Sequence, residues 1–221
     1  MYYSSGQLLS GLTRGWSAHT IVIVKILVIL AHPSQVSFNH AIAERAVQAL
    51  NINGHKVIFH DLYREAFSPE LSYHEILGNE KIPAEIKEYC RELAEAEGII
   101  IVHPNWWGQP PAILKGYVDR IFRTNVAYRF KEGDKGEGIP LGLLKARSAL
   151  VFNTSNTAGS REMEIFGDPL ETLWKNCIFD LCGVKTFYRS TFGVIVTSTA
   201  EQRRAWLDEV QDTINRYFPS R

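Results

Sequence analysis

Short runs of consecutive apolar residues alternate along this chain with longer segments in which apolar residues recur at helical spacing. The short runs predict buried strands at 26–31, 56–60, 98–102, 149–152 and 185–196. The periodic segments predict helices at 39–50, 83–96, 111–123, 170–181 and 201–218. Two stretches rich in loop-forming residues, 62–82 and 131–138, are expected to lie on the surface. Strands that alternate with helices in this way predict an α/β fold with a doubly wound, five-stranded parallel sheet.

The number of strands and the first turn together narrow the topology. Five strands suit the order 2-1-3-4-5 better than a six-stranded dinucleotide-binding sheet. The turn at 31–39 also lacks the glycines of a G-x-G-x-x-G motif, which argues against a standard nicotinamide dehydrogenase. No internal repeat and no G-x-S-x-G hydrolase elbow is present in the sequence.

Length and composition fit one domain. The chain has 221 residues, of which 45% are hydrophobic and 22% are charged, enough for one substantial core that we place at residues 25–221. Residues 1–24 show no clear period and contain no acidic residue, so we expect a disordered or appended tail. Basic and acidic residues balance at 24 each, so no overall field favours nucleic acid or an anionic membrane.

The cysteines and the first apolar run bear on location. Cys90, Cys177 and Cys182 have neither a C-x-x-C nor a metal-ligand spacing, so we expect reduced core thiols in a cytoplasmic protein and no metal site. The apolar run at 21–31 is interrupted by Lys25 and is too short to cross a bilayer. Insertion into a membrane is therefore not expected.

A loop rich in tryptophan and proline follows the third predicted strand. It contains Pro104, Asn105, Trp106, Trp107 and Gly108. In open α/β sheets, ligands bind at the carboxyl ends of the strands, and two indoles at that edge suit a flat conjugated ring. The alternative is that the indoles cover an edge of the core or contact a second subunit.

The turn after the first strand has the features of an anion site. Ser37 or Asn39 can cap the following helix, whose free backbone N–H groups and dipole favour a phosphate or pyrophosphate. The alternative is that Ser37 only caps the helix and that His32 is a core histidine with internal partners.

A polar run emerges directly from the fourth predicted strand and should reach the same edge of the sheet. It begins with Asn153, Thr154, Ser155 and Asn156. Donors of this kind would suit the pyrimidine edge of an isoalloxazine ring, which gains negative charge on reduction. A loop that merely caps the next helix would use the same residue types.

Together, these segments resemble the flavodoxin-like NAD(P)H:quinone oxidoreductase family, which includes ancillary flavoproteins of bacterial potassium-efflux systems. The similarity extends from about Lys25 to Phe218. Its motifs are the segments 31–33 with 37–39, 104–108, 111–116 and 167–169. The resemblance implies a flavodoxin-like fold.

The resemblance also implies which residues form the site. The phosphate-bearing tail of a flavin would be held by His32, Ser37, Phe38 and Asn39. The isoalloxazine would be lined by Pro104, Asn105, Trp106, Trp107 and Gly108, and its pyrimidine edge by Asn153, Thr154, Ser155 and Asn156. Family members often have two glycines where this chain has Ser155 and Asn156. The substrate would be bordered by Tyr128 and Phe130.

One departure from the family bears on mechanism. In animal quinone reductases, a tyrosine and a histidine after the polar loop are thought to relay charge or a proton. This chain offers Ser160 or Arg161 and then Phe166, which cannot carry a proton. Either amides and Arg161 stabilise the reduced flavin, or the acceptor differs from a typical quinone. Arg161 is the one candidate charge stabiliser, and no other catalytic residue is assigned.

By this resemblance, the chain is a flavin-dependent NAD(P)H oxidoreductase. A hydride would pass from NAD(P)H through the flavin to a quinone-like acceptor by a ping-pong mechanism, with nitroaromatic or azo compounds as alternative acceptors. FAD is favoured because the Ser-Phe-Asn turn matches FAD-using members, and FMN is the alternative. A homodimer is expected. Two alternatives remain, a regulatory flavoprotein subunit of a membrane transporter and a flavodoxin-type electron carrier.

Overall fold

A five-stranded parallel sheet forms the centre of the computed structural model, which describes residues 23–78, 81–134 and 137–220. In spatial order its strands are β2 (Lys56–Asp61), β1 (Lys25–Leu30), β3 (Gly98–Pro104), β6 (Ser148–Ser155) and β7 (Thr186–Gly193). All neighbouring strands are parallel. The predicted order 2-1-3-4-5 is therefore confirmed. Nearly all of the predicted tail, residues 1–22, lies outside the described residues.

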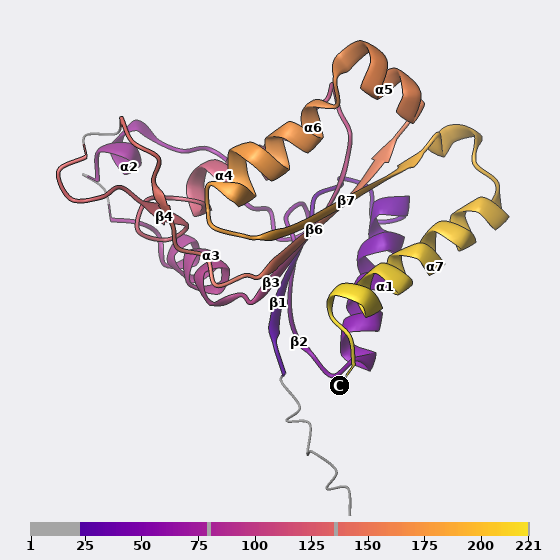
Figure 1. Ribbon diagram of the computed structural model, residues 1–221, viewed down its shortest axis with the longest axis horizontal. Coiled ribbons are helices and arrows are strands. Elements are labelled where there is room, and N and C mark those ends of the chain that lie inside the picture. The colour runs from indigo at the N-terminus through magenta and orange to yellow at the C-terminus, as the bar shows by residue number, and fades with distance from the viewer. Residues whose placement is uncertain (1–22, 79–80, 135–136, 221) are drawn as a thin grey trace, which may run out of the picture.

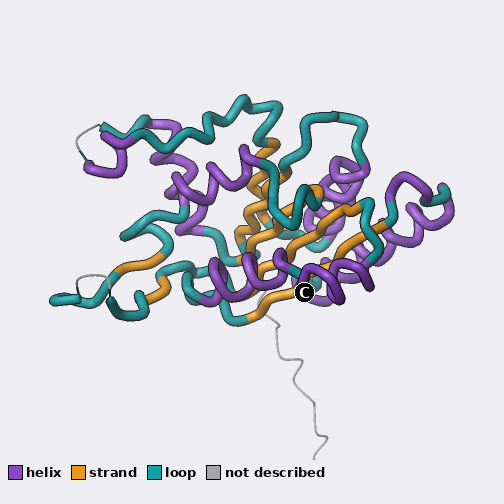
Figure 2. Tube along the Cα trace, turned by 90° about the horizontal axis from the view of Figure 1, so that it is seen from above, coloured by secondary structure: helices purple, strands orange, loops and turns teal. Residues whose placement is uncertain are grey.

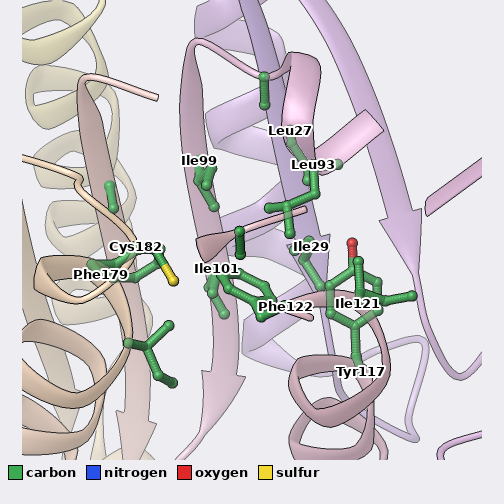
Figure 3. Packing of buried hydrophobic residues seen from close by; sticks show 14 of the residues in the cluster. Leu27, Ile29, Leu93, Ile99, Ile101, Tyr117, Ile121, Phe122, Phe179 and Cys182 are labelled. Carbon is green, nitrogen blue, oxygen red and sulfur yellow. The ribbon is translucent and has the colours of Figure 1, made fainter. Parts of the chain in front are cut away.

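Helices cover both faces of the sheet (Figure 1). One face is covered by α1 (Phe38–Ile52) and α7 (Ala200–Tyr217). The other is covered by α3 (Ala84–Glu95), α4 (Ala112–Ile121), α6 (Pro169–Glu171) and η1 (Thr172–Asp180), a stretch of π-helix that continues α6. Side chains of successive strand residues point to opposite faces, so Val28 packs under α1 while Leu27 and Ile29 pack in the other layer (Figure 3).

Several short elements were not expected from the sequence. They are α2 (Tyr73–Leu77), α5 (Gly159–Phe166), the antiparallel pair β4 (Tyr128–Arg129) and β5 (Leu141–Gly142), and the 3-10 turn η2 (Ile195–Thr197) that follows β7. The β4–β5 pair stands apart from the main sheet (Figure 2). α5 has eight residues and buries none of them, and its apolar side chains Met163, Ile165 and Phe166 are exposed rather than packed on the sheet.

The segment 62–82 is anchored by a buried ion pair although it is poor in secondary structure. Glu75 of α2 accepts hydrogen bonds from Arg120 at 2.8 Å and from Arg123 at 3.3 Å. Arg120 also donates to the carbonyl oxygen of Ser68 at 2.7 Å. These bonds hold the loop against α4.

The three cysteines are free, but they do not share one environment. Cys90 and Cys182 are buried, whereas Cys177 is exposed. The prediction of three core thiols was wrong at Cys177, because its position in η1 faces away from the sheet. Among the described residues, no helix combines the length and hydrophobicity that a bilayer span requires.

Candidate functional site

The predicted site segments meet at the carboxyl edge of the sheet because β1, β3 and β6 are neighbours there. The amide of Ala31 donates to the carbonyl of Val102 at 2.9 Å, and that of Asn105 to the carbonyl of Thr154 at 2.7 Å. Asn39 Nδ2 donates to Thr154 Oγ1 at 2.8 Å. The start of α1, the tryptophan loop and the polar end of β6 are thus linked directly.

The N-terminus of α1 carries a chain of hydrogen-bonded side chains. Ser37 is the N-cap, and its Oγ accepts the backbone N–H of His40 at 3.3 Å. The same Oγ lies 2.9 Å from His40 Nδ1, and His40 Nε2 lies 3.0 Å from Asp61 Oδ2 at the end of β2. His40 and Asp61 were not identified from the sequence. The spacing of a capping serine and a histidine three residues later was the available signal.

The other predicted residues of this turn divide between side-chain and backbone roles. His32 is half-buried, its Nδ1 accepts the backbone N–H of Ser34 at 3.0 Å, and burial lowers its pKa. The ring of Phe38 packs against Phe192 and Trp206 in the core. Phe38 can therefore offer a ligand its backbone N–H but not its ring.

The tryptophan loop is a tight turn with two residues in the left-handed region. Trp106 and Gln109 exchange backbone hydrogen bonds of 3.0 Å in both directions, and the φ angles of Trp107 and Gly108 are 57° and 70°. Positive φ at both central positions is characteristic of a type I′ turn. A Cβ at Gly108 would meet Pro169 Cγ at 2.6 Å, so this position requires glycine. The turn presents Trp107 fully to solvent.

A pocket of about 580 Å³ opens between this loop and α5. Its lining residues are Asn105, Trp107, Gly108, Thr157, Arg161, Glu162, Phe166 and Pro169. Asn105 fixes both walls, because its Nδ2 donates to Glu162 Oε1 at 3.0 Å and its Oδ1 accepts the N–H of Gly108 at 2.9 Å. The guanidinium of Arg161 lies over the ring of Phe166, with its Cζ 5.9 Å from the ring centroid. Thr157 and Glu162 were not predicted as site residues.

At the end of β3, directly before the tryptophan loop, a buried polar network centres on His103. Its Nε2 is the acceptor for Trp174 Nε1 at 2.9 Å and for Asn153 Nδ2 at 2.8 Å, while its Nδ1 lies 2.8 Å from the carbonyl oxygen of Pro104. Two donors at Nε2 leave the proton on Nδ1, which therefore donates to that carbonyl. Burial, aided by the nearby charge of Arg189, lowers the pKa of His103 to about 4. The imidazole is neutral at neutral pH.

Arg189 of β7 joins this network to the loop before α6. It donates to Asn153 Oδ1 at 3.2 Å and to Glu171 Oε2 at 3.0 Å, and it forms an ion pair with Asp168. Asp168 caps α6 from the left-handed region, with a φ of 49°. Both Oδ1 and Nδ2 of Asn153 therefore form hydrogen bonds within the protein interior.

The remaining predicted residues are not all gathered in the pocket. Ser155 Oγ accepts the N–H of Thr157 at 3.0 Å, and Asn156 Oδ1 accepts that of Val196 at 3.1 Å, outside the pocket lining. The rings of Tyr128 and Phe130 pack edge to face near β4, with their centroids 5.9 Å apart, and neither residue lines the pocket. β4 lies on the side of α2 and α3, away from α5 (Figure 1).

The residues present fit a flavin nucleotide. Pockets that take small ligands and cofactors usually measure about 300 to 1,000 Å³, and the observed volume falls within that range. At the N-terminus of α1, where a phosphate is expected, Asn39 Oδ1 is buried without a hydrogen-bond partner. It can therefore accept a hydrogen bond from a ligand that carries hydroxyl groups, as a ribityl chain does. Within the described residues, no cluster of His, Cys, Asp and Glu has the arrangement of a metal site.

Sequence relatives of this chain are oxidoreductases. It is 35% identical to an uncharacterized NAD(P)H oxidoreductase of Haemophilus influenzae, over 82% of this chain and 90% of that protein. It is 29% identical to ribosyldihydronicotinamide dehydrogenase [quinone] of Mus musculus, over 81% of this chain and 86% of that protein. These names agree with the prediction of an enzyme of the NAD(P)H dehydrogenase (quinone) type.

Solved structures show the same fold. An NAD(P)H:quinone oxidoreductase from Methanothermobacter marburgensis superposes with a TM-score of 0.72 at 24% identity, covering 90% of this chain and 96% of the other. An FMN-dependent NADH-azoreductase from Bacillus anthracis, in complex with FMN, gives 0.70 at 17% identity, covering 88% and 99%. The family model described as the flavodoxin-like fold matches residues 24–214. The family resemblance inferred from the sequence motifs is therefore confirmed, and the chain belongs to the flavodoxin-like fold family.

Proposed function

We propose that this protein is a flavin-dependent NAD(P)H oxidoreductase that reduces a quinone-like acceptor by a ping-pong mechanism. FAD is the proposed cofactor, with FMN as the alternative. The observation that carries the proposal is the meeting of the α1 N-terminus, the tryptophan loop and the polar end of β6 at one edge of the sheet. A cytoplasmic location belongs to the same proposal.

The start of α1 would bind the phosphate groups. The first N–H groups of a helix have no partner within it, and the helix dipole favours an anion there. Ser37 adds a hydroxyl at that point, and Asn39 Oδ1 is free to accept a hydrogen bond from the ribityl chain. Phe38 would contribute through its backbone alone, because its ring is in the core.

The pocket would hold the isoalloxazine ring, which when bound supplies the two-electron chemistry. Trp107 would cover part of the ring, and Asn105 keeps the loop at a fixed distance from α5. Arg161 lines the pocket and would stabilise the negative charge that develops there, the role a preorganised cation plays best in a site that excludes water. Glu162 is the one carboxylate among the lining residues, so it is the candidate for holding or moving a proton.

The acceptor side of the site would be completed by a second copy of the chain. Tyr128 and Phe130, proposed to border the substrate, do not line the pocket of their own chain. Large apolar side chains are exposed close to the pocket in sequence and space, namely Trp107, Met163, Ile165 and Phe166. Exposed apolar groups of this kind favour a protein interface, and a homodimer accounts for both observations.

Absorbance spectroscopy and steady-state kinetics test the function. The purified protein should show flavin bands that NAD(P)H bleaches and a quinone restores, and double-reciprocal plots at several quinone concentrations should be parallel. Arg161→Gln should retain flavin but lower kcat by about 100- to 1,000-fold, as expected for loss of one charge-stabilising group. Arg91→Gln, an exposed change on α3, is the matched control. A colourless protein that takes up neither FAD nor FMN would refute the proposal.

A further inference from the structure

The direction of the Ser37 hydroxyl proton depends on the protonation of His40. Asp61 accepts two hydrogen bonds, from His40 Nε2 at 3.0 Å and from the backbone N–H of Arg64 at 3.2 Å. An ionised carboxylate only accepts, so Nε2 carries a proton in either charge state of the ring. In neutral His40 the other nitrogen, Nδ1, is then bare and must accept. Ser37 Oγ, 2.9 Å away, is the donor.

This arrangement leaves Ser37 without a donor for an anion. A serine hydroxyl has one proton, and in the neutral state that proton points inward to Nδ1. The oxygen would then present only lone pairs to a phosphate at the start of α1, and phosphate oxygens are also acceptors. When Nδ1 is protonated, His40 donates to Ser37 Oγ and the hydroxyl proton is free to turn outward.

We propose that His40 is a positioning residue that couples cofactor binding to proton uptake. On this proposal, which rests on the proposed function, a flavin phosphate at the α1 N-terminus is bound together with one proton taken from solvent. The proton goes to His40 Nδ1, Asp61 pairs with the resulting imidazolium, and Ser37 donates to the phosphate. His40 is buried, so its added charge requires the buried Asp61 carboxylate as partner.

Two other groups near His40 bear on the pH dependence. Asp61, at the end of β2, favours the charged ring, whereas His32, in the loop after β1, opposes it when charged itself. The rings of His32 and His40 lie 6.4 Å apart. Burial lowers the pKa of His32, so His32 is mostly neutral at the pH of the experiment and is the second candidate for the proton.

Isothermal titration calorimetry counts the proton directly. FAD is titrated into the full chain freed of flavin, at about pH 8, in buffers of different ionisation enthalpy that contain no phosphate. At this pH, binding should take up close to one proton, and the affinity should then fall with rising pH by up to tenfold per pH unit. FAD is the suitable probe because its pyrophosphate does not titrate in this range.

Variants and a phosphate-free ligand assign the proton. His40→Gln keeps an amide donor toward Asp61 but cannot be charged, so proton uptake should vanish. Asp61→Asn, which removes the counter-charge, should strongly reduce it and serves as the second variant should His40→Gln not fold. His32→Gln and the surface change His74→Gln should retain the uptake. Riboflavin, which lacks the phosphate, should bind the unmodified protein without it.

The outcomes separate this inference from the proposed function. Uptake that is lost in His40→Gln and absent with riboflavin supports the inference. FAD binding without uptake, or with uptake that persists in His40→Gln or disappears in His32→Gln, overturns it and leaves the proposed function intact. A chain that binds no flavin at any pH refutes both.

Discussion

Replacing Trp107 by glycine should stabilise the protein while weakening its hold on the flavin. Trp107 has a φ of 57°, in a region that L-residues avoid, and its side chain is fully exposed. The substitution therefore relieves backbone strain without removing buried surface. It also removes the indole that we assign to the isoalloxazine.

The expected gain follows from two opposing terms. Relief of the left-handed conformation contributes about 1–2 kcal/mol, and the greater freedom of glycine in the unfolded chain costs about 0.5–1 kcal/mol. The net increase in the free energy of unfolding is about 0–1.5 kcal/mol. For a chain of this size, that corresponds to a rise in Tm of up to roughly 6 °C. Loss of stacking should cost about 1–3 kcal/mol of flavin binding, or roughly 5- to 150-fold in Kd.

Urea unfolding of flavin-free protein, with separate titration of FAD, measures both effects. Flavin must be absent from the unfolding experiment because a bound ligand adds its own stabilisation. Ala66→Gly is the matched control, since Ala66 also has a positive φ, 51°, and is exposed outside the site. It should raise stability and leave FAD affinity unchanged. A Trp107→Gly protein that is less stable than the unmodified chain, or that binds FAD equally well, would refute this reasoning.

Three further predictions concern the same edge of the sheet. Gly108→Ala should destabilise the protein by about 1–3 kcal/mol, since the new Cβ clashes with Pro169 and the φ of 70° is retained; a thermal shift assay measures this, and an unchanged Tm contradicts it. Ser37→Ala removes the side-chain cap of α1, so it should lower the free energy of unfolding by about 0.5–2 kcal/mol. Denaturant unfolding measures this free energy, and an unchanged value would contradict the prediction. His103 has a pKa of about 4 when folded and about 6.5 when unfolded, so the unfolded chain binds more protons between these values. The neutral imidazole of His103 therefore adds about 3 kcal/mol to the free energy of unfolding above pH 6.5, and this contribution is lost as the pH falls towards 4. His103→Gln should make the free energy of unfolding less dependent on pH in this range. An equal pH dependence in the variant and the unmodified protein would contradict the assignment.

The long elements could be predicted from the sequence because their burial leaves a pattern in it. Strand β3 is fully buried, so it appears as an unbroken apolar run, and α7 packs one stripe against the sheet. Short elements without such burial were not predicted. α5 buries no residue, and β4 and β5 are two residues each, too short for any period to show.

The site was predictable as a set of segments but not as a set of contacts. Strand ends that follow apolar runs must meet at one edge, which places the tryptophan loop beside the start of α1. The partners of His103 are distant in the sequence, since Trp174 lies 71 residues away and Asn153 lies 50 residues away. No local pattern records such pairs. For the same reason, the sequence did not reveal that the ring of Phe38 packs in the core against Phe192.

The buried hydrogen-bond network around His103 stabilises the strained turn at Trp107. Trp107 can be held in an unfavourable conformation only if the residues around it are fixed, and Asn105 fixes them through its backbone N–H and both ends of its side chain. The residue before it, Pro104, is held in turn by the Nδ1 proton of His103. That proton stays on Nδ1 because Asn153, oriented by Arg189, occupies Nε2. A charge on β7 thus helps to determine the position of an exposed indole across the sheet, although the two side chains do not touch.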